Sequence, residues 1–368
     1  MNERIDGAKF ESGPETETGR DATAVTDIGK RKREHIEICL REDVSGRGGG
    51  TGLEDYRFRH AALPELDFAG VDPSCSFLNR KLKAPLLVSS MTGGTDEASR
   101  INVRLAEAAE RRGWAMGLGS LRAAIERPET VRSYKVRPYA PNVPLLANLG
   151  AVQLNCGYGV DECRRAVELT EADGLVLHLN GLQELFQTGG DTNFGGLLRR
   201  IERLCRAAEF PVGVKEVGWG IDGGTAKALA EAGVAFVDVA GAGGTSWSEV
   251  EKRRSADPLR RAAADAFADW GIPTAECVVE VRAAVPSATV IASGGIAGGV
   301  EAAKALALGA DLVGLGRALL APALASEDAI DAAFARVEFE LKAAMFGIGA
   351  ANVGQLKGTR RLEKRRRS

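Results

Sequence analysis

The chain has 368 residues, 45% of them hydrophobic, which is typical of a globular protein with one large domain and extensions. Its 48 Lys and Arg residues nearly balance its 50 Asp and Glu residues, so no overall charge favours nucleic acid or an anionic membrane as a partner. No apolar run reaches the roughly 20 residues of a membrane-spanning helix, and six cysteines without a CxxC spacing favour a reduced, cytoplasmic protein. We therefore expect a small-molecule partner.

The N-terminal part of the chain precedes the regular pattern. Residues 1–29 are polar and lack a hydrophobic period, which is typical of a mobile extension. Residues 30–83 follow, beginning with the basic cluster RKREHI at 31–36. This cluster is either the solvated face of a helix or a clamp for a diphosphate group that folds over a binding site.

A regular alternation begins at residue 84, in which short runs of Val, Leu and Ile alternate with Ala-rich amphipathic stretches such as 99–112, 224–233 and 299–310. The alternation predicts a parallel sheet covered by helices. Eight repeats favour an α/β fold of the (β/α)8 TIM barrel type at 84–358 over an open, doubly wound sheet. The predicted strands are 84–91, 114–120, 144–150, 174–180, 211–218, 235–241, 288–295 and 311–317.

Two further segments depart from the alternation. The interval from 241 to 288 predicts an extended loop after the sixth strand, and long loops in compact domains are commonly lids or site walls. Residues 359–368 form a basic tail that we expect to be solvated.

All eight predicted strands end in glycine or polar residues. Catalytic groups of TIM barrels lie at the carboxyl ends of the strands, so these residues are expected to face one mouth. They are Met91-Thr92-Gly93-Gly94, Ser120-Leu121-Arg122, Asn148, His178 to Glu184, Lys215-Glu216, Thr245-Ser246-Trp247, Gly294-Gly295 and Gly316-Arg317.

The turns after the last two predicted strands indicate a phosphate-binding site. Glycine-rich turns at 293–299 and 314–320 each lead into a helix, and such turns after strands 7 and 8 commonly bind phosphate in this fold. Arg317 adds a charged donor. Lys215, within the apolar run VGVKEVG, needs either a strand-end carboxylate or an anionic ligand such as the N1–C2=O edge of a reduced flavin. Met91 to Gly94 fits the heteroatom edge of a flavin, or forms a plain turn.

Several motifs together resemble those of the type 2 isopentenyl diphosphate isomerases, flavin-dependent enzymes of isoprenoid synthesis, from Arg31 to Lys357. HLNGLQE with RKREHI is the specific part, since pieces such as SGGI occur across FMN barrels. The resemblance implies conversion of isopentenyl diphosphate to dimethylallyl diphosphate by a 1,3-allylic proton shift. Reduced FMN would be the acid/base cofactor, with Mg²⁺ on the diphosphate and NADPH as reductant. It also implies a cytoplasmic homo-oligomer, a tetramer or octamer. The remaining motifs are SSMTGG, GLGSLRA, ANLGAVQ, PVGVKEVGWGI, DVAGAGGTSW, IASGGI and KALALGADLVGLGR.

The resemblance also implies roles for individual residues. Gln183 is the implied catalytic residue and Glu184 the implied Mg²⁺ ligand. The implied substrate contacts are Arg31, Lys32, Ser120, Arg122, His178, Asn180 and Gln183. The implied FMN contacts are Met91, Thr92, Gly93, Ser120, Asn148, Lys215, Thr245, Gly294, Gly295, Gly316 and Arg317.

The chemistry of the fourth strand end agrees with these roles. An amide is barely basic, so we expect Gln183 to orient the C–H bonds or to relay a proton. A neighbouring diphosphate favours a protonated His178 as donor, and Glu184 beside phosphate oxygens suits Mg²⁺. The alternatives are a 2-hydroxy-acid oxidase or dehydrogenase, which needs a His base with arginines, and an idle flavin- or phosphate-binding barrel.

Three segments depart from the family pattern. Gly181 stands where the family has proline, and QTGGD at 187–191 where it has QPEGD, so we expect a more flexible loop after strand four. Ala297 stands where the family often has arginine, so the FMN phosphate is expected to depend on Arg317 and backbone amides.

Overall fold

The computed structural model describes residues 22–365 and shows a closed barrel of eight parallel strands, with neighbours in the order β10-β11-β4-β5-β6-β7-β8-β9. The barrel confirms the predicted (β/α)8 fold, and each predicted run contains one strand. The strands are β4 (Leu86–Val88), β5 (Ala115–Gly117), β6 (Leu145–Gly150), β7 (Gly174–His178), β8 (Val212–Lys215), β9 (Phe236–Asp238), β10 (Thr289–Ala292) and β11 (Leu312–Leu315).

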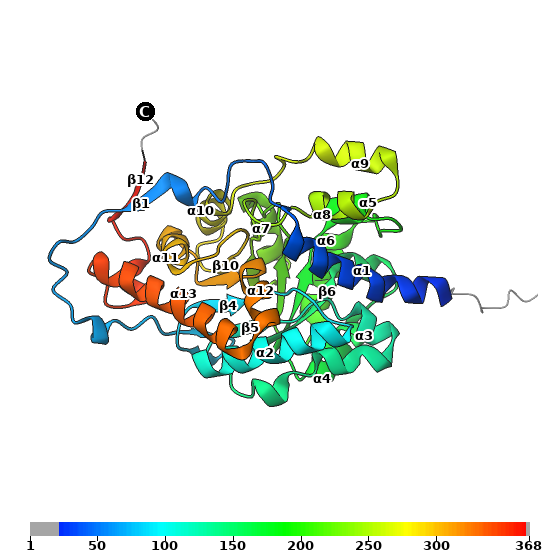
Figure 1. The fold of residues 1–368 in the computed structure, drawn as a ribbon, viewed down its shortest axis with the longest axis horizontal. Helices are drawn as coiled ribbons and strands as arrows, with labels where there is room; N and C mark the ends of the chain where they lie inside the picture. The colour runs from blue at the N-terminus through cyan, green and yellow to red at the C-terminus, as the bar shows by residue number, and fades with distance from the viewer. Residues whose placement is uncertain (1–21, 366–368) are drawn as a thin grey trace, which may run out of the picture.

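Helices surround the barrel (Figure 1). Local sequence sets their ends: Thr95 caps α2 by accepting from the N–H of Ala98, and Gly113 ends this helix in the left-handed conformation. The longer outer helices are α2 (Asp96–Arg112), α4 (Val160–Thr170), α6 (Leu197–Ala207), α7 (Gly223–Glu231), α10 (Thr274–Ala284), α11 (Gly299–Leu308) and α13 (Glu327–Gly347). The other helices around the mouth and the chain end are α3 (Arg122–Glu126), α5 (Gly181–Phe186), α12 (Arg317–Ala325) and α14 (Val353–Leu356).

The apolar core has two parts, one between barrel and helices and one inside the barrel. A hairpin of β2 (Cys75–Phe77) and β3 (Arg80–Leu82) contributes Phe77 and Leu82 to the inner part. The Phe77 ring packs edge-on against Phe236 with centroids 5.3 Å apart. The hairpin therefore plugs the amino-terminal end of the barrel and leaves the opposite mouth for the site.

Three segments differ from their sequence-based interpretation. Helix α1 (Ala22–Arg41) begins within the predicted extension, of which residues 1–21 lie outside the described part. β12 (Leu362–Lys364) pairs antiparallel with β1 (Tyr56–Phe58), so the predicted basic tail is partly structured; residues 366–368 lie outside the description. The predicted loop after the sixth strand contains α8 (Trp247–Arg254), α9 (Pro258–Asp265) and α10.

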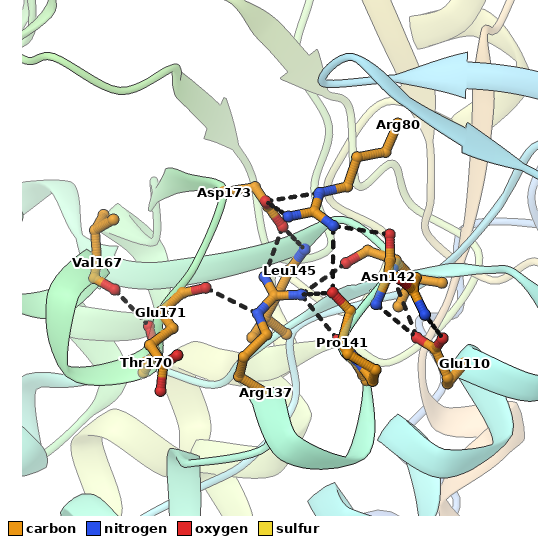
Figure 2. Close-up of polar contacts among 12 residues, drawn as sticks. Arg80, Glu110, Arg137, Pro141, Asn142, Leu145, Val167, Thr170, Glu171 and Asp173 are labelled. Atoms are coloured by element: carbon orange, nitrogen blue, oxygen red, sulfur yellow. Dashed lines mark hydrogen bonds and ion pairs between the residues drawn. The ribbon is translucent and has the colours of Figure 1, made fainter.

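Two arginine–aspartate pairs close the amino-terminal end of the barrel. Figure 2 shows the first, in which Arg137 Nη2 donates to Asp173 at 2.6 Å and Nη1 donates to the carbonyls of Ala140 and Val143. Asp173 precedes β7, and its carboxylate also accepts the N–H of Leu145 at the start of β6. The guanidinium therefore joins two neighbouring strands and has its donors satisfied by protein oxygens.

The second pair repeats this arrangement between β10 and β11. Arg282 Nη2 donates to Asp311 at 2.6 Å, and the same carboxylate oxygen accepts the N–H of Val290 at 2.8 Å. The Arg282 Nη1 group donates to the carbonyls of Pro286 and Ala288. Since β10–β11 lies four strands from β6–β7 around the barrel, the two pairs brace it on opposite sides.

Candidate functional site

Two adjoining cavities open at the carboxyl ends of the strands, under helix α1, which packs on α8 and α12 (Figure 1). The larger cavity has a volume of about 590 Å³ and the smaller pocket about 150 Å³. They share one wall, so two ligands placed in them would touch. The shared wall consists of Lys32, His35, Ser90, Met91, Lys215, Val217 and Trp247.

Glycine turns after β9 and β10 line one end of the larger cavity. A Cβ on Gly294 (φ +100°) would lie 2.0 Å from the carbonyl oxygen of Gly241, and one on Gly295 (φ +75°) would lie 2.5 Å from that of Gly243. Only glycine allows these backbones to approach so closely. Helix α12 begins directly after β11, so its first N–H groups lack intrahelical partners, and Arg317 lies there too. This end of the cavity suits a phosphate group.

Lys215 lies on the shared wall at the end of β8 and is only 8% exposed. Its ammonium group donates to the main-chain oxygen of Glu216 at 2.5 Å. The Glu216 carboxylate instead accepts the N–H groups of Val217, Gly218 and Trp219 at 2.6–2.7 Å. Lys215 therefore forms no ion pair with Glu216; its charge acts on Asp238, which is in register with it on β9, and the cation lines both cavities.

The larger cavity fits a flavin mononucleotide. Its volume lies in the usual range of about 300–1,000 Å³ for cofactor sites. The Ser89 hydroxyl lines it and is buried without a hydrogen-bond partner among residues 22–365, so it can bond to a ligand. The glycine turns at one end suit the FMN phosphate, and the buried Lys215 on the shared wall suits the electron-rich edge of the flavin ring.

His178 lies in the smaller pocket at the end of β7. Its Nδ1 is 2.8 Å from Asn148 Oδ1. Burial, reinforced by the nearby charges of Lys215 and Lys32, lowers the pKa of His178 to about 3. The imidazole is therefore neutral among these neighbours, because no counter-charge offsets its desolvation; the protonated donor expected beside a diphosphate stays a prediction.

Asn180 and Glu184 are bonded to one another beside His178. Asn180 Nδ2 donates to Glu184 Oε1 at 2.8 Å, while the side-chain oxygen Asn180 Oδ1 is buried without a partner in the described part of the chain. Glu184 Oε2 accepts the N–H of Asp191 at 2.8 Å. Within residues 22–365 no cluster of three His, Cys, Asp or Glu side chains could hold a metal ion. A Mg²⁺ ion at Glu184 would thus need substrate oxygens and water as its remaining ligands.

Four cations line the smaller pocket, namely Lys215 of the shared wall together with Lys32, Arg122 and Arg31. Lys32 donates to Tyr134 Oη at 2.5 Å and to the Ser120 carbonyl at 3.2 Å, and burial lowers its pKa to about 7. Arg122 is bonded to carboxylates. Arg31 donates to none of the described residues. Since these cations line one pocket, and both Arg31 and one Arg122 nitrogen keep unused donors, the pocket suits a polyanionic ligand.

Glu251 of α8 is a site residue that the sequence interpretation missed. Its side chain is 1% exposed and lies near His35 Nε2 (2.9 Å), Gln183 Nε2 (3.3 Å) and Arg254 Nη1 (2.6 Å). Its only sequence signal is the polar segment SWSEVEKRR inside a predicted loop. Tertiary packing alone brings it to the strand ends.

The structure brings most of the predicted site residues together. Gly93 lines neither cavity, because its missing side chain makes room for the Tyr134 ring, 2.0 Å from where a Cβ would lie. The larger cavity contains Met91, Thr92, Lys215, Thr245, Gly294, Gly295, Gly316 and Arg317. The smaller pocket contains Arg31, Lys32, Ser120, Arg122, Asn148, His178, Asn180, Gln183 and Glu184.

Comparison with known proteins gives the family. The isopentenyl-diphosphate delta-isomerase of Oceanobacillus iheyensis is 53% identical to this chain, covering 91% of it and 96% of the relative. That of a Nostoc species is 50% identical, covering 91% and 95%. The chain belongs to the isopentenyl-diphosphate delta-isomerase family. This confirms the resemblance predicted from the motifs.

The isomerase family shares its fold with flavin enzymes of other activities. A family model described as FMN-dependent dehydrogenase matches residues 180–363. A solved structure of a mandelate oxidase variant superposes with a TM-score of 0.61 at 19% identity, covering 91% of this chain and 98% of the oxidase. At that identity the likeness shows the fold alone. None of the helices between residues 22 and 365 has the length and hydrophobicity to cross a membrane.

Proposed function

We propose that the protein interconverts isopentenyl diphosphate and dimethylallyl diphosphate by a 1,3-allylic proton shift. It would use reduced FMN in the larger cavity, Mg²⁺ on the diphosphate and NADPH as reductant. The shared wall between the two cavities carries the proposal, because it places a flavin-sized site against a pocket rich in cations. The family of the chain supports the same reaction.

The residues of the larger cavity would hold FMN by its two ends. The turn at Gly294 and Gly295, the first turn of α12 and Arg317 would bind the phosphate. Lys215 would meet the electron-rich edge of the ring and offset negative charge there. Bound reduced FMN supplies a group that can give and take a proton without net redox change.

The residues of the smaller pocket would hold the diphosphate. Arg31 and Arg122 would donate to its oxygens, and Glu184 would share its Mg²⁺. In neutral His178 the Nδ1–H donates to Asn148 Oδ1, which leaves Nε2 as an acceptor; Nε2 would donate to a diphosphate oxygen once the anion supplies the counter-charge that lets the ring take up a proton. The alkenyl end would then lie toward Met91 and Trp247 on the shared wall.

Gln183 would orient the reacting C–H bonds. Its amide is fixed from both sides, since Nε2 donates to Glu251 at 3.3 Å and the carbonyl accepts from Asn180 at 3.4 Å. Glu251 is thus a positioning residue for Gln183 and His35. An amide fixed in this way selects which hydrogen of the substrate faces the flavin site.

Product analysis tests the proposal. The protein is incubated anaerobically with FMN, Mg²⁺, NADPH and isopentenyl diphosphate, and the allylic product is followed by NMR. We expect dimethylallyl diphosphate with reduced FMN and none with oxidised FMN. Reduction of the flavin by mandelate, without isomerisation, would instead establish the 2-hydroxy-acid oxidase alternative.

We also infer a cytoplasmic homo-oligomer, a tetramer or octamer. The family resemblance supports this inference, and analytical ultracentrifugation of the FMN-loaded protein measures it. A monomer at micromolar concentration would contradict it.

A further inference from the structure

We propose that Asp191 is a positioning residue for the smaller pocket, which orients Arg122 and Gln153 with its carboxylate and Glu184 with its backbone N–H. The inference rests on the proposed function, because it assigns a supporting residue to the proposed diphosphate site. Asp191 does not line the pocket, whereas these three partners do.

The three partners come from three successive strand ends. Arg122 begins α3 after β5, Gln153 lies in the 3-10 helix η5 (Ala151–Asn155) after β6, and Glu184 lies in α5 after β7. Arg122 Nη1 and Gln153 Nε2 donate to the same Asp191 oxygen at 2.7 and 3.1 Å. Asp191 N–H donates to Glu184 Oε2 at 2.8 Å. One residue thus connects the proposed metal ligand to a diphosphate-binding cation.

Arg122 keeps donors for a ligand in this arrangement. Its Nε donates to Glu126 at 2.9 Å and its Nη1 to Asp191, while Nη2 donates to no residue between 22 and 365. A guanidinium has five N–H donors in a rigid plane, so bonds at Nε and Nη1 fix the direction of Nη2. Arg122 lines the smaller pocket, where a diphosphate oxygen could accept from that group.

The turn before Asp191 explains how its N–H reaches Glu184. Gly189 has φ +70°, and a Cβ on Gly190 would lie 2.0 Å from the Glu184 carbonyl oxygen. The turn is therefore packed against α5, and Gly190 N–H donates to Gln187 at 3.2 Å. Gly190 therefore has a packing role, while Gly189, where the family has glutamate, adopts the left-handed conformation that makes the turn.

The Asp191 carboxylate is suited to hold a cation. Partial burial raises its pKa, but hydrogen bonds from Gln153 and Arg122 outweigh this and hold the pKa below its ordinary value. The carboxylate therefore remains ionised at neutral pH, where its bonds to these donors are charge-assisted.

Titration calorimetry with inorganic pyrophosphate tests the inference on the FMN-loaded full chain in Mg²⁺. We expect Asp191→Asn to weaken pyrophosphate binding about tenfold to a hundredfold, the usual effect of losing a charged hydrogen bond. KM for isopentenyl diphosphate should rise by a similar factor with kcat changed less than about threefold. Asp161→Asn, at an 86% exposed side chain, is the matched control and should bind like wild type.

The same substitution made in an Arg122→Gln protein tests whether Asp191 acts by positioning Arg122 or only through its negative charge. In the Arg122→Gln protein, adding Asp191→Asn should weaken pyrophosphate binding by a factor at least about threefold smaller than the factor it causes in wild type. The inference is overturned if Asp191→Asn weakens pyrophosphate binding by the same factor in both proteins. It is also overturned if the Asp191→Asn variant binds pyrophosphate like wild type. If the asparagine variant does not fold, Asp191→Glu replaces it, because its longer side chain also displaces the oxygen that Arg122 needs.

The outcomes distinguish this inference from the proposed function. A wild-type protein that binds pyrophosphate without isomerising isopentenyl diphosphate overturns the function and leaves the positioning role. A protein that isomerises, but whose Asp191→Asn variant keeps its pyrophosphate affinity and KM, overturns the positioning role alone. No pyrophosphate binding by wild type overturns both.

Discussion

The two ends of the barrel use the same side chain in opposite ways. At the amino-terminal end, Arg137 is 12% exposed and donates to one carboxylate and several carbonyls, as Figure 2 shows. At the mouth, Arg31 lines a pocket and donates to no described residue. A buried cation with satisfied donors holds the fold together, whereas one without partners is available for a ligand. Unused donors therefore distinguish Arg31 from Arg137, whereas Lys32, Lys215 and Arg122 combine hydrogen bonds to the protein with a place on the pocket wall.

The first prediction tests the structural role of Arg137 at the amino-terminal end of the barrel. Arg137→Met should lower the free energy of unfolding by about 1.5–3 kcal/mol, because it removes the guanidinium donors from one Asp173 oxygen and from the carbonyls of Ala140 and Val143, while Arg80 still pairs with the other Asp173 oxygen. Urea unfolding followed by circular dichroism measures the change. Arg132→Met is the matched control: its pair with Asp96 has 73% and 81% exposed side chains, so the change should stay below about 1 kcal/mol. Equal losses would refute the structural assignment of Arg137.

The second prediction removes a cation from the mouth. Lys215→Ala should keep the fold but weaken FMN binding about tenfold to a hundredfold, so that the protein purifies pale. FMN fluorescence titration gives the dissociation constant. Lys227→Ala, at an exposed position on α7, should retain the yellow colour. Unchanged affinity in the Lys215 variant would show that the ring does not meet this lysine.

The third prediction concerns the proposed metal ligand. Glu184→Gln should raise the Mg²⁺ concentration needed for half-maximal isomerisation by about tenfold, because it removes one of the few carboxylate ligands. A Mg²⁺ titration of the initial rate measures the effect. A half-maximal concentration equal to that of wild type excludes Glu184 as the ligand.

The fourth prediction is a pH dependence at the mouth. Burial, with the charges of Arg31 and Arg127, lowers the pKa of Lys32 to about 7. The cation is therefore present below pH 7 and lost above it, so its contribution to pyrophosphate binding should fall about tenfold between pH 6 and pH 8. The ratio of wild-type to Lys32→Met affinity isolates this contribution, since both titrations share the ionisation of pyrophosphate. A ratio that stays constant with pH contradicts the assignment.

The barrel and the strand-end residues were predictable because their signals are local. A run such as GLVLH must be buried on both faces, and the residues after it meet the mouth in any barrel of this type. Thus His178, Lys215 and Gly294 were predicted where the structure has them. The low pKa of His178 was not predicted, because it depends on cations from other elements.

The residues that were missed act through tertiary contacts. Glu251 lies on a helix inside a predicted loop, and Tyr134 reaches Lys32 from the 3-10 helix η3 (Pro128–Tyr134). Asp191 follows a turn whose path depends on two glycines. None of these positions has a periodic pattern that points to the mouth, so only the three-dimensional contacts identify them.

The central claim is that the mouth holds two anionic ligands side by side, FMN in the larger cavity and a diphosphate in the smaller pocket. Anaerobic titration of the FMN-loaded, reduced protein with isopentenyl diphosphate tests it most directly, by calorimetry together with filtration of free flavin. We predict one diphosphate bound per chain, with the flavin retained throughout. Release of FMN in proportion to the diphosphate added would mean one shared anion site and would contradict the account.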